Sequence, residues 1–87
     1  MNIETTIHIW RESGQYVAHA MPIDVMSSGP TPDAARIALD EAVRLFLHTA
    51  ADSGTLEELL EECGYQQSPE GWTNPAFVAL ERHAVAM

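Results

Sequence analysis

The stretch Ser28-Gly29-Pro30-Thr31-Pro32-Asp33-Ala34-Ala35 decides the fold that this sequence predicts. Thr31 is a natural helix N-cap, because its hydroxyl can accept a hydrogen bond from a free amide of the first turn. Pro32 has its φ angle already set for the first helical position, and Asp33 carries a favourable charge for the first turn. The stretch therefore predicts the point at which a short β-meander ends and one long helix begins.

The predicted helix runs from this junction to about residue 50 or 51. Its apolar side chains recur at helical spacing and form one stripe, which consists of Ala35, Ala38, Leu39, Ala42, Val43 and Phe46. Half of the stripe is alanine, and small side chains allow a helix axis to approach a sheet closely. We therefore expect the helix to lie against the sheet that precedes it.

Two alternating segments precede the junction and predict an antiparallel hairpin. In the first, Ile3, Ile7 and Ile9 share one face, and the other face carries His8 and Trp10. Residues 11–14 form a polar loop suited to a hairpin of three to five residues. The second strand covers residues 15–21, and a short third strand is expected from residue 25 to residue 27 or 28.

After the long helix, Ser53-Gly54 predicts a break. Thr55 followed by Glu58 resembles a capping box, so a short second helix is expected up to Cys63. Residues 66–74 are polar and contain a proline and a glycine, which predicts a loop, whereas residues 77–85 alternate again and predict a last strand.

These elements predict one α+β domain over residues 1–87 with the order β-β-β-α-α-β. The sheet would have about four strands, with the helices on one face. The other face would be open and would carry Trp10, His8 and either Met21 or His19. A half-apolar open face on so small a domain indicates a second subunit or another partner, so we expect self-association, most simply as a dimer.

The charge balance favours a protein partner over nucleic acid. Thirteen acidic residues stand against four arginines, which gives a formal net charge of −9, and the arginines are scattered. Phosphate backbones are bound by grouped cations, so direct nucleic-acid binding by this domain alone is not expected. An acidic surface suits a basic protein partner. The alternative is that the acidity only keeps the domain soluble.

Cys63 is the only cysteine, which excludes an internal disulfide and fits a reducing compartment. No apolar run approaches the ~20 residues that span a bilayer, and the first residues do not resemble a signal peptide. These features predict a cytoplasmic protein without a membrane partner.

Several motifs resemble the HicB antitoxin family: Tyr16-Val17-Ala18, then Pro22, then the junction at residues 28–34, and then Glu41-Ala42. The resemblance covers roughly residues 3–65. It implies a partial ribonuclease H-like fold and binding to a small basic, RNA-cleaving, HicA-like toxin, which the antitoxin masks within a toxin–antitoxin system. Two departures stand out. Residues 23–26 replace the Leu-Pro-Gly-Cys turn that the family often has, and the DNA-binding domain common in full-length members has no counterpart here.

No catalytic, cofactor-binding or metal-binding set is predicted, so the protein is not expected to be an enzyme. Two-metal nucleases need converging carboxylates. The candidates are spread over a strand, a loop and a helix: Glu4, Asp24, Asp40 and Glu41. The histidines show no tight ligand spacing. Ser27, Ser28 and Thr31 lack a nucleophile-elbow motif and are explained by capping and strand-edge roles.

The predicted partner-binding residues are therefore Trp10, Trp72 and Glu12. Tryptophan is enriched among interface hot spots, and an acidic rim residue steers a basic partner. For Trp72 two interpretations stay open: an anchor for a partner, or an aromatic side chain that folds back over the edge of the core. The alternatives to an antitoxin are a stand-alone homo-oligomeric structural or adaptor domain and a divergent metal-dependent nuclease.

Overall fold

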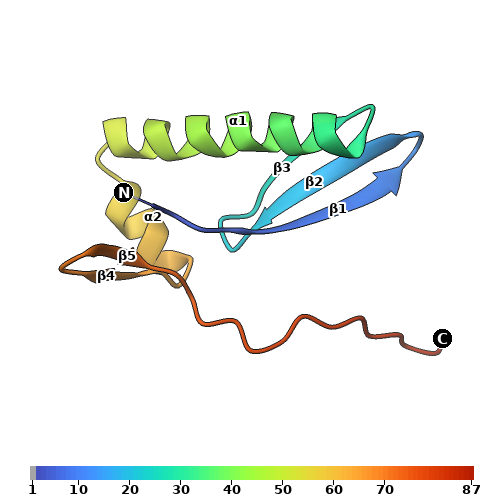
Figure 1. Ribbon diagram of the computed structural model, residues 1–87. Coiled ribbons are helices and arrows are strands. Elements are labelled where there is room, and N and C mark those ends of the chain that lie inside the picture. The colour runs from blue at the N-terminus through green and yellow to red at the C-terminus, as the bar shows by residue number, and fades with distance from the viewer. Residues whose placement is uncertain (1) are drawn as a thin grey trace.

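The computed structural model of this protein describes residues 2–87. The chain opens with a three-stranded antiparallel sheet made of β1 (Thr6–Glu12), β2 (Gln15–Met21) and β3 (Val25–Gly29), in the order β1-β2-β3 (Figure 1). The three strands expected from the sequence are confirmed. The first connection is tighter than expected, because β1 extends to Glu12 and pairs there with Gln15. Ser13 and Gly14 both have positive φ angles, 50° and 79°, as two-residue hairpin loops require.

The helix α1 (Pro32–Asp52) begins where the junction predicts. The Thr31 hydroxyl accepts a hydrogen bond from the Ala34 amide at 3.0 Å, which is the expected N-cap. The junction also explains Gly29 at the end of β3. A Cβ atom on Gly29 would lie 2.7 Å from the Ala35 nitrogen, so only glycine allows the helix to start this close to the strand.

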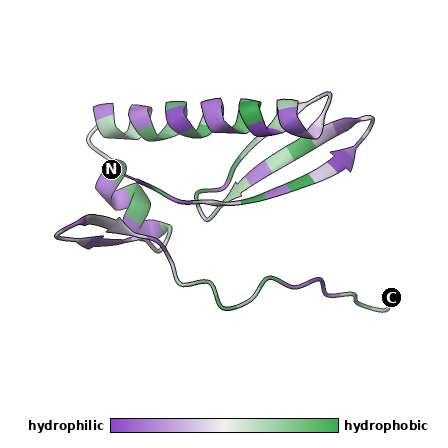
Figure 2. Ribbon diagram, viewed as in Figure 1, coloured by the Kyte–Doolittle hydropathy of each residue, from purple (hydrophilic) through white to green (hydrophobic). Residues whose placement is uncertain are grey.

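The helix α1 covers one face of the sheet, mainly over β2 and β3 (Figure 1). The side chains between the two layers are small: Ala18 and Ala20 from β2 and Ala35 from α1 are fully buried, and Leu39 is 1% exposed. Figure 2 shows hydrophobic residues alternating with hydrophilic ones along the strands and along α1. The alanine-rich stripe therefore allows α1 to pack closely against the sheet, as its composition predicts.

The short helix α2 (Leu56–Glu62) packs against the end of α1 and against β4, beyond the edge of the three-stranded sheet. The helix is confirmed, but the expected capping box at its start is wrong. The Thr55 hydroxyl donates back to the Ala50 carbonyl at 3.3 Å and caps no amide within the described chain. Leu60 anchors α2 in the core. Gly64 follows α2 with φ +94°, the left-handed conformation expected there.

The region after α2 differs from the prediction. Instead of a loop, residues 66–74 contain a small hairpin of β4 (Gln66–Ser68) and β5 (Gly71–Thr73). Gly71 has φ +126°, and Ser68 donates a hydrogen bond to its carbonyl, so the turn is held locally. The last strand expected over residues 77–85 is wrong, because residues 74–87 contain neither helix nor strand.

The α+β class is thus confirmed, while the main sheet has three strands rather than four. Tyr65, directly after α2, is 2% exposed and donates a hydrogen bond from its hydroxyl to the Glu4 carbonyl. This contact ties the segment before β1 to the end of α2. The chain leaves β5 on the side of the sheet opposite α1 (Figure 1).

Candidate protein-binding surface

The face of the sheet turned away from α1 is built by strand alternation. The register pairs Thr6 with Met21, His8 with His19 and Trp10 with Val17, and all six side chains lie on this face. Two more come from β3, so the surface that we call the open face consists of Thr6, His8, Trp10, Val17, His19, Met21, Met26 and Ser28. Trp10 and Met21 are each 37% exposed and Met26 is 52% exposed. Large apolar side chains therefore lie in solvent on one side of a thin domain.

The centre of the open face is organised around His19. Its Nε2 lies 2.6 Å from Oδ1 of Asp24, and its ring meets the ring of Trp10 edge-on, with 6.3 Å between the ring centroids. Asp24 reaches His19 because it has a left-handed φ of 62° in the turn before β3, where its amide bonds to the Ala20 carbonyl. The Trp10 ring is thus held against a side chain that is itself fixed, which preorganises the aromatic surface.

Of the three residues predicted to bind a partner, the structure places two together. Trp10 and Glu12 lie two positions apart on β1, and both side chains are on the same side of the strand, at the rim of the open face. Trp72 lies elsewhere, on β5 opposite Gln67. It is half-buried and packs against the hydrophobic core. Of the two interpretations of Trp72, this position favours the aromatic side chain at the core edge.

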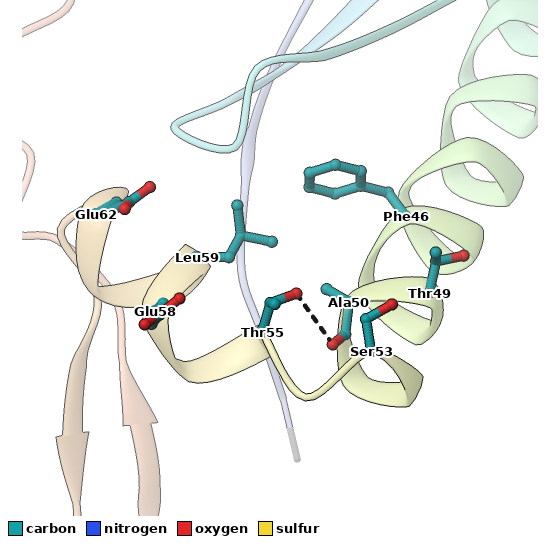
Figure 3. Close-up of a pocket in the computed structure, with 8 residues that line it drawn as sticks. All are labelled: Phe46, Thr49, Ala50, Ser53, Thr55, Glu58, Leu59 and Glu62. Atoms are coloured by element: carbon teal, nitrogen blue, oxygen red, sulfur yellow. Dashed lines mark hydrogen bonds between the residues drawn. The ribbon is translucent and has the colours of Figure 1, made fainter.

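A second apolar surface is a groove between the end of α1 and α2, which the sequence does not predict (Figure 3). Phe46 from α1 and Leu59 from α2 point toward each other across it, and Glu58 and Glu62 stand on the α2 side (Figure 3). Phe46 belongs to the apolar stripe of α1, yet it is 37% exposed. The stripe was visible in the sequence, but the groove depends on the angle between two helices, which periodicity does not specify.

Negative charge is concentrated on α2, beside the groove. The helix α2 carries four exposed glutamates, Glu57, Glu58, Glu61 and Glu62. In α1, Arg36 pairs with Asp33 and Arg44 with Asp40, so both cations of the helix are neutralised locally. The potential of the surface is therefore dominated by carboxylates, which suits a cationic partner.

Two side chains near α2 have pKa values shifted by their surroundings. Burial raises the pKa of the Cys63 thiol, and the nearby carboxylates of Glu62 and Asp24 add to the rise. Burial is also the main reason that the pKa of Tyr65 is raised, with Cys63 and Glu4 contributing. A thiol with a raised pKa is a poor nucleophile, so Cys63 is better described as a packing residue than as a reactive one.

Within residues 2–87, no three His, Cys, Asp or Glu side chains are grouped closely enough to hold a metal ion. Over the same residues, neither helix combines the length and apolarity that crossing a membrane requires. Comparison with known proteins gave no match to any protein-family model, any curated protein or any solved structure.

Proposed function

We propose that this protein is a protein-binding module whose open face receives a basic protein partner. The observation that carries the proposal is the exposure of Trp10, Met21 and Met26 on one face of an acidic chain. Exposed apolar side chains on one face increase the binding affinity when a partner covers them. Complementary charge increases the association rate and the specificity.

The partner that fits best is a small basic toxin that cleaves RNA, and the protein would then be a HicB-like antitoxin that masks it in the cytoplasm. The support is the set of motifs shared with that family, together with the excess of carboxylates over arginines. In this proposal the domain is not an enzyme and does not bind nucleic acid by itself. It acts by covering the toxin.

We expect Trp10 to contribute most to the affinity of the proposed interface. Its indole is exposed but held edge-on by His19, so little conformational entropy is lost when a partner covers it. Truncating an aromatic anchor that a partner covers costs about 2 kcal/mol or more, which is about 30-fold in Kd. Glu12 stands at the rim, where a charge affects the association rate more than the final affinity.

The experiment is a titration of the protein with the purified product of a short, basic reading frame next to its gene, at low and at physiological ionic strength. We expect Trp10→Ala to weaken binding about 30-fold, and Glu12→Gln to slow association mainly at low salt. The matched control is Trp72→Ala, which removes the same side chain outside the open face. Inhibition of RNA cleavage by the partner is the functional readout.

Equal loss of affinity for Trp10→Ala and Trp72→Ala would contradict an interface on the open face. Binding without any inhibition of RNA cleavage would contradict the antitoxin role while leaving a binding module. Circular dichroism of each variant shows whether the change acts through folding, because Trp10 also belongs to an edge strand.

A second candidate function is a homo-oligomeric structural or adaptor domain. The observation that favours it is the run of exposed apolar residues after β5, with Val78 at 98% and Leu80 at 72% exposure. A cytosolic chain seldom leaves such a run in water without a protein to cover it. Sedimentation equilibrium of the isolated protein tests this candidate directly.

A further inference from the structure

This chain exposes more surface than a folded domain of its size should. Its accessible area is 6608 Å², whereas a compact monomer of 9.6 kDa is expected to expose about 5,100 Å². The radius of gyration is 14.8 Å, against about 12 Å for a compact chain of this length. About 1,500 Å² of surface per chain is thus in excess.

The excess is concentrated in the segment after β5, residues 75–87, which we call the arm. In Figure 1 the arm leaves the body of the domain as an extended trace. It carries five of the large exposed hydrophobic side chains of the protein, namely Phe77, Val78, Leu80, Val85 and Met87. The arm therefore exposes apolar area that the rest of its own chain does not cover.

The body of the domain has an unpaired strand edge at β1. This strand is at the edge of the sheet, and no strand within residues 2–87 pairs with its outer side. Its side chains are also incompletely covered, because α1 lies over β2 and β3. Ile7 is on the same face as the buried Ala20, yet it is 44% exposed. An edge strand with free amides and carbonyls is a template for another strand.

The arm has the pattern and length of the missing strand. Residues 77–85 alternate in the way that the sequence analysis reads as a strand. At about 3.3 Å per residue they span about 30 Å when extended, enough to run the full length of seven-residue β1. In its own chain the arm does not use this edge. Residues 77–80 instead approach the open face near Thr6, His8 and Met21, across a shallow pocket.

We propose that the arm of one copy adds as a strand to the β1 edge of a second copy, and that the exchange is reciprocal. Such an exchange closes on a two-fold axis and leaves neither arm exposed. A stable interface needs about 800 Å² from each partner, and the excess surface of this chain is larger than that. The main-chain hydrogen bonds would come from β1, and the apolar contacts from Ile7 and the arm.

The proposal shares β1 with the interface proposed for the basic partner, but it uses the main-chain groups of the β1 edge and Ile7, whereas the partner would use the side chains of Trp10 and Glu12. Its first test is sedimentation equilibrium of the full chain at micromolar concentration. We expect a dimer for the unchanged protein and at least a tenfold weaker dimer for Leu80→Glu. The matched control is Leu45→Glu, since Leu45 is 69% exposed but lies on α1. The control should leave the dimer unchanged. A monomeric unchanged protein, or equal effects of both substitutions, would overturn the proposal.

The second test separates exchange from an arm that docks on its own chain. In a Cys63→Ser background, one chain carries Ile7→Cys and another carries Leu80→Cys. Mixed and oxidised with copper phenanthroline, the two should give a covalent heterodimer, because the arm of one lies beside β1 of the other. A chain that carries both cysteines should give mainly a linked dimer at the same concentration. An intramolecular link in that chain, with no heterodimer in the mixture, would show that the arm folds back and would overturn the proposal.

Discussion

At the scale of single residues, the strongest constraint is the close approach of α1 to β3. The Gly29 site has no room for a side chain, because the backbone of Ala34 and Ala35 lies within 3 Å of where a Cβ would be. Helix and strand are both part of the core here, so neither can move without disturbing the alanine layer between them. Gly29 is therefore required by packing, although its φ angle is not in the left-handed region.

We predict that Gly29→Ala lowers the free energy of unfolding by about 1–3 kcal/mol, the usual cost of overpacking a core. Urea denaturation followed by circular dichroism measures it. The control is Ser28→Ala, one residue earlier and exposed on the open face, which should change stability by less than about 0.5 kcal/mol. Similar small effects of both substitutions would show that the helix start can shift away from the strand at little cost.

Tyr65 gives a second prediction, which concerns pH. Its pKa is raised in the folded protein, mainly by burial, so the folded state prefers the neutral phenol that donates to the Glu4 carbonyl. The stabilisation is complete below the ordinary tyrosine pKa of about 10 and is lost as pH rises through the higher folded value. Stability should therefore begin to fall at about pH 10 and continue to fall as the pH rises further.

The measurement is thermal unfolding across this rise in pH for the unchanged protein, Cys63→Ser and Tyr65→Phe. The Cys63→Ser variant removes the other group in this region whose pKa is raised. The Tyr65→Phe variant should lose part of the alkaline slope, and at neutral pH it should be less stable by about 1 kcal/mol for the lost hydrogen bond. An unchanged slope in Tyr65→Phe would show that the pKa of this phenol is the same in the folded and the unfolded protein, which would contradict the prediction.

At the scale of elements, the two helix starts show what a capping motif in a sequence can and cannot tell. Both have a threonine in the N-cap position, but only the Thr31 hydroxyl accepts from an amide of its helix. Thr55 comes three residues after the end of α1 at Asp52, and its hydroxyl donates to the Ala50 carbonyl of that helix instead. The same residue type is a cap in one place and a connection between two helices in the other.

We predict that Thr31→Ala costs about 1 kcal/mol of stability, the usual value of an N-cap. The Thr55→Ala variant should cost less, since its hydrogen bond is long, at 3.3 Å, and ends on the Ala50 carbonyl, which also accepts from the Thr55 amide. Chemical denaturation of the two variants under identical conditions makes the comparison. A larger loss for Thr55→Ala would mean that the turn between α1 and α2 contributes more to folding than the cap of the long helix.

The order of the elements was predictable up to α2 because local signals specify it. Alternation, the Ser13-Gly14 turn, Thr31 and Gly64 each act within a few residues. The two errors lie after α2. Residues 66–74 were expected to form a loop because Pro69 and Gly71 are turn residues. In the structure Pro69 lies in the turn of a small hairpin and Gly71 begins its second strand. Residues 77–85 have a strand pattern, but a strand also needs a neighbour, and a pattern does not supply one.

At the scale of the whole molecule, the part of the candidate site that depends on strand alternation was predictable from the sequence, as the order of the elements up to α2 was. Alternation along β1 placed Trp10 and His8 on one face, and the observed register puts both His19 and Met21 beside them. Glu12 was expected in the loop, and the structure adds it to the strand. The position of Trp72 at the core edge and the groove below Phe46 depend on how α2 and the small hairpin pack, which involves contacts between distant residues. No short-range signal in the sequence encodes those contacts.

The last prediction follows from the net charge of −9, which the whole molecule shares. The paired arginines of α1 neutralise only neighbouring aspartates, so the four exposed glutamates of α2 repel one another and the other carboxylates. Repulsion of this kind destabilises the compact state and is screened by salt, with a Debye length that falls from about 30 Å at 0.01 M to about 8 Å at 0.15 M. The melting temperature should therefore rise between those two ionic strengths. Scanning calorimetry in sodium chloride measures the rise, and choline chloride as the control should give the same rise, because screening depends on ionic strength and not on the cation. A melting temperature that falls with salt would mean that the two arginine–aspartate ion pairs of the described chain outweigh its carboxylate repulsion.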